Sequence, residues 1–274
     1  MGLRILTAVV LFAVLIPLTL WAPVALFSFF VLLVFCGVFW EWSGLLLPPK
    51  GPRIALVAAL FVLGVTLVFD PYLDPRSLTN EVLGTASFVW LFVLPWALWQ
   101  GRTPRGLLGL GLAAVACFAG FWAVWQARYE GLVFLVSILL LVWSADTAAY
   151  FAGKAFGRRR LAPTISPGKT WEGVLGALVV NLLVMTALAF FVFESWSARL
   201  IDRLGLFPFL LAVLGLTGYS VLGDLHQSLL KRQAAVKDSG HLLPGHGGLF
   251  DRLDAVLVVM PLAVFMEVWA ESGL

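Results

Sequence analysis

Residues 24–46 read VALFSFFVLLVFCGVFWEWSGLL, an apolar run with a single charged side chain. A run of this length is sufficient for an α-helix to cross the hydrocarbon core of a bilayer. Because hydrocarbon offers no water, the backbone of such a segment must satisfy its own hydrogen bonds, which favours a helix. Residues 24–46 therefore predict a transmembrane helix.

Similar apolar runs of about 17 to 25 residues recur along the chain, separated by short polar or Gly/Pro breaks. The first run follows Arg4 and has the look of a signal peptide, but another apolar run comes next instead of a cleavage site and a polar region. We therefore expect an all-α, polytopic membrane bundle of nine helices. Their predicted ranges are 5–22, 24–46, 53–69, 80–100, 105–126, 131–153, 172–193, 206–230 and 249–270.

The composition supports burial in lipid. Hydrophobic residues make up 61% of the 274 residues and charged residues only 12%, whereas a soluble domain carries about 25% charge. A soluble core of this size could not bury so many apolar side chains. Both cysteines, Cys36 and Cys117, lie inside apolar runs and fit neither a disulfide nor a metal pattern.

Basic residues predict the orientation, because they concentrate in cytoplasmic loops. With nine spans, the N-terminus and the loops after the second, fourth, sixth and eighth helices share one side. That side holds Arg4, Lys50, Arg53, Arg102, Arg105, Lys154, Arg158, Arg159, Arg160, Lys169, Lys231, Arg232, Lys237 and Arg252, whereas the other holds Arg76, Arg128, Arg199 and Arg203. We therefore expect the first side to be cytoplasmic.

Polar residues are distributed unevenly. Residues 1–140 are mainly apolar spans, and the chemistry-bearing side chains concentrate in residues 144–254. We treat residues 1–274 as one membrane domain with a catalytic segment at 144–254. An ion-coupled transporter would place polar residues near the bilayer middle and in both halves, so this distribution disfavours transport.

Residues 223–254, GDLHQSLLKRQAAVKDSGHLLPGHGGLFDRLD, hold four aspartates and all three histidines. Asp224 falls late in one expected helix, and Asp251 and Asp254 fall on one face at the start of the next. Carboxylates at the edge of hydrocarbon are costly and suggest function. Converging carboxylates need a cation, and hard oxygen ligands suit Mg²⁺. Two simpler explanations remain open: pairing of Asp224 with a lysine, and interaction of Asp251 or Asp254 with the helix dipole.

The segment Pro244-Gly245-His246-Gly247-Gly248 precedes the last helix. Its glycines allow the backbone amides to form an anion nest with the helix N-terminus, although a simple interhelical turn is the alternative. The histidines have no zinc-type spacing and no cysteine partners, so zinc is not expected.

Residues 144–173, SADTAAYFAGKAFGRRRLAPTISPGKTWEG, form the second polar stretch. Asp146, Tyr150 and Gly153 share one helix face. The three arginines at 158–160 are a topology signal, a lipid contact or part of the site. Ser166 or Thr170 can cap the following helix, and Lys169 near a helix start suits phosphate better than the helix dipole.

These residues resemble the phosphatidate cytidylyltransferase (CDP-diacylglycerol synthase) family. The matching signature spans 27 residues and comprises Ser228, Lys231, Arg232, Lys237, Asp238, Gly240, Pro244, His246, Gly247, Gly248, Asp251, Arg252 and Asp254. The run Ser166-Pro167-Gly168-Lys169-Thr170-Trp171-Glu172-Gly173 also resembles the family, which usually has a second lysine where Gly168 stands. The N-terminal half matches in character only.

The resemblance implies transfer of CMP from CTP to phosphatidate, with Mg²⁺ as cofactor and a second cation such as K⁺ as a further expectation. It implies a homodimer in the bacterial inner membrane, with the active site on the cytoplasmic side and no nucleic-acid partner. The family's metal-binding aspartates map onto Asp224 and Asp251.

We accordingly expect two groups of site residues. The catalytic group is Asp224, Asp251, Lys231, Lys237 and Asp238. The substrate-binding group is Asp146, Ser166, Lys169, Arg232, His246, Gly247, Gly248, Arg252 and Asp254. The alternative function is a CTP-dependent polyprenol or phytol kinase, which would share the basic loops and metal-binding carboxylates.

Overall fold

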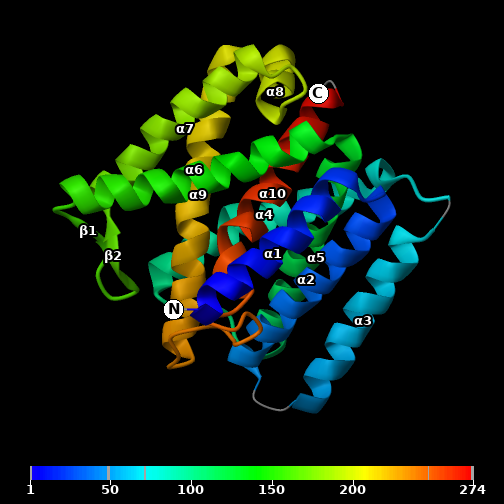
Figure 1. Cartoon of the computed structure of the whole chain (residues 1–274). Helices are drawn as coiled ribbons and strands as arrows, with labels where there is room; N and C mark the ends of the chain where they lie inside the picture. Colours follow the sequence, from blue (N-terminus) through cyan, green and yellow to red (C-terminus); the bar gives the residue numbers. More distant parts are fainter. Residues whose placement is uncertain (1, 48–49, 71, 246, 273–274) are drawn as a thin grey trace.

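The computed structural model describes residues 2–47, 50–70, 72–245 and 247–272. This part of the chain forms ten α-helices, one 3₁₀ turn and one two-stranded hairpin (Figure 1). In chain order they are α1 (Gly2–Trp21), α2 (Val24–Leu46), α3 (Lys50–Val68), η1 (Pro75–Leu78), α4 (Thr79–Gln100), α5 (Gly106–Glu130), α6 (Leu132–Phe156), β1 (Arg160–Ala162), β2 (Ser166–Thr170), α7 (Trp171–Phe191), α8 (Trp196–Leu204), α9 (Leu206–Gln233) and α10 (Phe250–Glu271).

The predicted all-α, polytopic membrane fold is confirmed. Eight helices of the described chain are long and apolar enough to cross a bilayer, namely α2 to α7, α9 and α10. They coincide with the predicted spans from 24–46 onward. The remaining predicted span, 5–22, coincides with α1, whose passage across the membrane stays a prediction.

Helix α8, the β1–β2 hairpin and the short turn η1 were not predicted. Helix α8 occupies what was expected to be a plain connection; the Ser195 hydroxyl accepts a hydrogen bond from the Ala198 amide at 3.1 Å and so caps it. Trp196 and Leu200 of this short helix are fully buried. The antiparallel hairpin β1–β2 connects α6 to α7. All three elements are too short to produce the long apolar run on which the prediction of helices depended.

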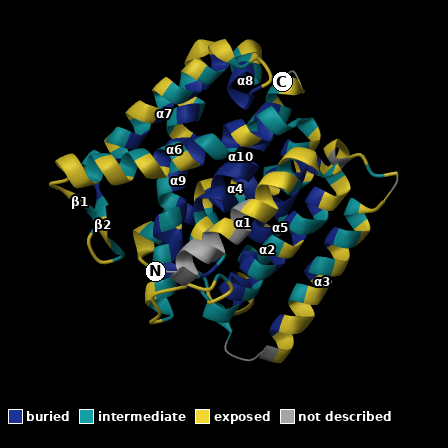
Figure 2. Ribbon diagram, in the orientation of Figure 1, coloured by how far each residue is buried: buried dark blue, intermediate teal, exposed yellow. Residues whose placement is uncertain are grey.

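The helices pack around α10. Figure 1 shows α10 in the middle of the bundle, and it contacts α4, α5 and α9 most extensively. Helices α6 and α7 run side by side as a pair, with the β1–β2 hairpin projecting at one end. Helix α3 lies at the periphery and is largely exposed (Figure 2), as expected for a helix that faces lipid.

A buried asparagine joins α6, α7 and α9, and two of these helices, α6 and α9, carry aspartates of the site described below. Asn181 of α7 donates from Nδ2 to the Leu141 carbonyl of α6 at 3.0 Å and to the Thr217 hydroxyl of α9 at 2.9 Å. Its Oδ1 accepts from the Ser144 hydroxyl of α6 at 2.6 Å. Interhelical hydrogen bonds of this kind hold transmembrane helices together where apolar packing alone is weak.

The two sets of loops gather at opposite ends of the bundle. At one end, Arg105 and Thr103 after α4 bond to Gln233 at the end of α9. At the other end, Glu130 of α5 accepts from Arg76 at 2.8 Å and from Arg199 at 2.9 Å. This is the grouping that alternating spans predict. Three of the four arginines predicted on the non-cytoplasmic side are neutralised there by buried glutamates, since Arg203 also pairs with Glu267.

We expect Asn181→Leu to lower the stability of the purified protein by about 1 kcal/mol. The cost is modest because Thr217 also bonds to its own helix, at the Val213 carbonyl. Thermal unfolding in detergent measures the effect, with Val179→Leu at an exposed position of α7 as the control. Equal stability of Asn181→Leu and wild type would show that this contact does not hold the helices together.

Candidate active site

Three aspartates from different helices lie together near one end of the bundle. Asp146 belongs to α6, Asp224 to α9 and Asp254 to α10. Each lies within electrostatic reach of the other two and of Lys169. We call these three carboxylates the acid cluster. The structure thus brings together side chains that are between 30 and 108 residues apart in the sequence.

The hairpin delivers a lysine to the acid cluster. The Nζ atom of Lys169, on β2, lies 2.6 Å from Asp224 Oδ2 and donates to the Val221 carbonyl at 3.3 Å. The Thr170 hydroxyl caps α7 by accepting from the Gly173 amide at 3.1 Å, which fixes the end of β2. The sequence left open whether Asp224 pairs with a lysine, and the structure shows this pairing with Lys169. Three carboxylates and one lysine still carry net negative charge.

A cavity of about 540 Å³ opens beside this group. Asp146, Asp224 and Lys169 line it, and Tyr150 and Gly153 line it from the α6 face that the sequence predicted. Further basic and polar side chains complete the wall, namely Lys154, Arg160, Ser166 and Thr170. Acidic and basic groups side by side suit a cation together with a polyanionic ligand.

Asp251 has a different environment. Its Oδ1 accepts from Lys231 Nζ and Gln227 Nε2, both at 2.7 Å. Its Oδ2 accepts from the Ser239 amide at 2.9 Å, the Ser239 hydroxyl at 3.0 Å and the Gly248 amide at 3.1 Å. Both oxygens are thus held by donors. Asp251 fastens the loop between α9 and α10 to the end of α9.

This loop fits so closely around Asp251 that it requires glycine at two positions. Gly247 has φ +85°, a conformation that favours glycine, and a Cβ there would lie 3.3 Å from Asp251 Oδ2. A Cβ on Gly248 would collide with Ser239 and Glu41. The glycines predicted to form an anion nest therefore surround a carboxylate of the protein itself.

The remaining predicted residues are spread around these two centres. Lys237, Asp238 and Arg252 are exposed. Arg232 donates to the Ile165 carbonyl at 3.4 Å, which links the end of α9 to the hairpin turn. His246 lies outside the described residues.

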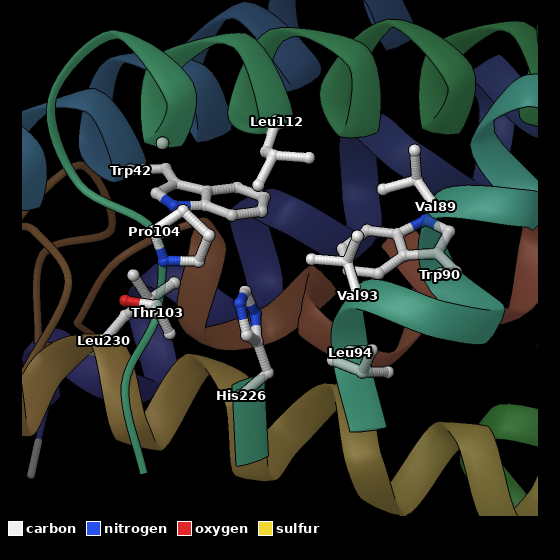
Figure 3. A pocket seen from close by; sticks show the side chains of 11 residues that line it. Trp42, Val89, Trp90, Val93, Leu94, Thr103, Pro104, Leu112, His226 and Leu230 are labelled. Carbon is white, nitrogen blue, oxygen red and sulfur yellow. The ribbon is translucent and has the colours of Figure 1, made fainter. Parts of the chain in front are cut away.

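His226 belongs to the core. It is 7% exposed and lies between the rings of Trp42 and Trp90, with centroid distances of 5.6 and 6.1 Å. Figure 3 shows it projecting from α9 toward Trp42 and Pro104 in a small pocket lined mainly by apolar residues. Its role here is packing.

Asp224 and Asp251, the predicted pair of metal ligands, thus have separate partners. Within the described ranges, no group of three His, Cys, Asp or Glu side chains is arranged to hold a metal ion. The metal assignment therefore stays a prediction.

Three polar residues at this end were not predicted to matter. They are Glu41, Gln227 and Ser239, and all three are buried. Glu41 did carry a signal, because it is the one charge in residues 24–46, and an ionisable residue in an apolar span indicates function.

These features define a polytopic membrane protein whose acidic and basic side chains gather around a cavity near one end of the helix bundle. The chain belongs to the cytidylyltransferase family, which matches residues 2–269. It is 36% identical over 281 aligned positions to a phosphatidate cytidylyltransferase of Pseudomonas aeruginosa, covering 97% of this chain and 96% of the relative. It is 32% identical to one of Staphylococcus saprophyticus over 265 positions, covering 96% and 97%. A third, from Haemophilus influenzae, is 44% identical over 133 residues, which is 48% of this chain and 45% of the relative. The resemblance found in the motifs is confirmed.

Gly248→Ala tests the fit of the loop around Asp251. We expect it to destabilise the protein by about 1–3 kcal/mol, because the added methyl group displaces Ser239 or Glu41. The matched control is Gly215→Ala on α9, where a Cβ meets nothing within 4 Å. Thermal unfolding of both variants in detergent measures the difference, and equal midpoints would contradict the described packing.

Proposed function

We propose that the chain transfers CMP from CTP to phosphatidate at the acid cluster and its cavity, giving CDP-diacylglycerol and pyrophosphate. Membership of the family over nearly the whole chain makes it a nucleotidyltransferase of phospholipid biosynthesis. The observation that carries the location is the cavity itself, where the carboxylates of Asp146 and Asp224 lie beside Lys154, Arg160 and Lys169.

The chemistry of the two substrates suits this location. CTP is a soluble polyanion, and phosphatidate is a lipid whose phosphate lies at the membrane surface, so both reach the mouth of a helix bundle. The phosphate of phosphatidate attacks the α-phosphorus of CTP, and pyrophosphate leaves. A phosphate near neutral pH is already a competent nucleophile, so catalysis is mainly positioning and neutralisation of charge. Lys154, Arg160 and Lys169 line the cavity and would bind phosphate oxygens.

The acid cluster carries the negative charge that would attract a divalent cation. Its three carboxylates exceed the charge of Lys169, and oxygen ligands are those that Mg²⁺ prefers. Asp224 would hold the ion, with Asp146 and Asp254 beside it. Mg²⁺ held there would supply charge neutralisation to the phosphate groups and to the leaving pyrophosphate. Asp251 fits less well, because its Oδ1 would have to exchange Lys231 and Gln227 for the ion.

The proposed location is the bacterial inner membrane, with the site on the cytoplasmic side. The supporting observations are the basic loops that gather at the end where the site lies, and the need for cytosolic CTP. A homodimer and a second cation such as K⁺ are further predictions from the family resemblance.

Position-specific labelling of CTP tests the function against the lipid-kinase alternative. Membranes or purified protein receive phosphatidate with CTP labelled at either the α- or the γ-phosphate. We expect label from α-³²P-CTP in a lipid product and none from γ-³²P-CTP, because CMP is transferred. Lipid labelled from the γ-phosphate alone would instead establish a kinase.

Carboxylate-to-amide variants test the division of roles between the two aspartates. We expect Asp224→Asn and Asp251→Asn each to lower turnover by more than about 100-fold, on the scale of losing one essential transition-state contact. Asp224→Asn should also raise the Mg²⁺ concentration needed for the residual activity, because it removes a ligand. The control is Asp202→Asn, an exposed aspartate on α8 at the opposite end.

Chelation completes this test. EDTA should abolish the activity of the wild type, and added Mg²⁺ should restore it. Full activity in chelator would contradict the metal proposal, and substantial turnover by purified Asp224→Asn would remove that residue from it.

A further inference from the structure

A buried glutamate from α2 lies beneath the loop that Asp251 fastens. Glu41 is 4% exposed and forms no salt bridge with any described residue. Its three hydrogen-bond donors all come from residues 239–250. Ser239 Oγ and the Phe250 amide donate to Oε2 at 3.0 and 2.9 Å, and the Leu242 amide donates to Oε1 at 3.4 Å. A carboxylate buried near hydrocarbon is costly unless such donors satisfy it.

Glu41 also serves the start of α10. Leu249, at the N-cap position, provides no side-chain cap for this helix. The Phe250 amide, in the first turn, instead donates to a carboxylate that is 209 residues away in sequence. A negative charge at a helix N-terminus interacts favourably with the helix dipole. Trp42 stacks on the Phe250 ring at a centroid distance of 4.8 Å and fixes the end of α2 against the start of α10.

Ser239 connects Glu41 to Asp251. Its hydroxyl oxygen lies 3.0 Å from Glu41 Oε2 and 3.0 Å from Asp251 Oδ2. A hydroxyl has one hydrogen, so it can donate fully to one carboxylate at a time. Asp251 Oδ2 also receives the Ser239 and Gly248 amides. A change at Glu41 therefore alters how far the Ser239 hydroxyl donates its hydrogen to Asp251.

The loop leaves no space between itself and the glutamate. A Cβ added to Gly240 or to Gly248 would collide with the Glu41 carboxylate. Glu41 is not among the residues that line the substrate cavity. Any effect on catalysis must therefore pass through the loop.

We propose that Glu41 is a positioning residue, whose buried carboxylate orders residues 239–250 and, through Ser239, orients Asp251. The proposal rests on the proposed function only in expecting turnover to depend on Asp251. The order of the loop is a property of the protein without substrate, so it can be measured separately.

The experiment compares four purified full-length proteins in detergent: wild type, Glu41→Gln, Ser239→Ala and the double variant. Hydrogen exchange of residues 238–250 reports the order of the loop, and steady-state kinetics report kcat and KM for CTP. The matched control is Glu267→Gln, because Glu267 is equally buried but pairs with Arg203 at the opposite end.

We expect Glu41→Gln to accelerate exchange in 238–250 and to lower kcat by about 10- to 100-fold, as supporting residues of catalytic groups do. Glutamine replaces one acceptor oxygen of Glu41 by an NH₂ group, which would face hydrogen-bond donors of the loop and lose a bond to them. KM for CTP should change little, because the cavity is not touched. Ser239→Ala should act in the same direction, and the double variant should be no worse than Glu41→Gln alone. Glu267→Gln should lower the unfolding temperature without these changes.

Wild-type exchange or wild-type kcat in Glu41→Gln would overturn the proposal, and additive losses in the double variant would overturn the link through Ser239. If Glu41→Gln does not fold, Ser239→Ala decides by the same readouts, since it removes only a hydroxyl. An inactive wild-type protein would contradict the proposed function, whereas the exchange measurement would still judge the role of Glu41.

Discussion

A carboxylate inside a helix bundle in lipid is stable only where donors or cations meet it, and this constraint organises the molecule. At the end opposite the acid cluster, arginines of η1 and α8 form salt bridges with Glu130 and Glu267. At the other end, Glu41 and Asp251 are met by the amides and hydroxyl of one loop. The acid cluster of Asp146, Asp224 and Asp254 is compensated least, with Lys169 as its salt-bridge partner. That difference is the physical reason for placing a cation there.

The same constraint explains how residues 144–254 depend on the apolar half of the chain. Helices α6, α9 and α10 carry the acid cluster, and Asn181 of α7 ties α6 to α9. Helix α2 supplies Glu41, which meets the loop next to Asp251. The proposed site is therefore supported from both halves of the sequence, even though its charged residues lie between 144 and 254.

Much of this was predictable from sequence. Long apolar runs predicted the membrane helices, because length and hydropathy are local properties. The signature from Ser228 to Asp254 predicted the family. The proximity of Asp146 and Lys169 to Asp224 is a finding of the structure. The hairpin and α8 were missed because short elements produce no long periodic signal. The bonds that Gln227 and Ser239 donate to Asp251 could not be predicted, and neither could the contact of Glu41 with Ser239. They arise from tertiary packing, and no local sequence pattern indicates which helix ends meet.

The central claim is that the acid cluster holds the cation on which transfer of CMP depends. Anomalous diffraction from crystals containing Mn²⁺ and CTP tests it most directly, because Mn²⁺ replaces Mg²⁺ at oxygen sites and can be located by its own signal. The account predicts a peak at coordination distance, about 2.1 Å, from a carboxylate oxygen of Asp224, with Asp146 and Asp254 adjacent. A peak bound by Asp251 but not by Asp224, or no peak at the acid cluster, would contradict it.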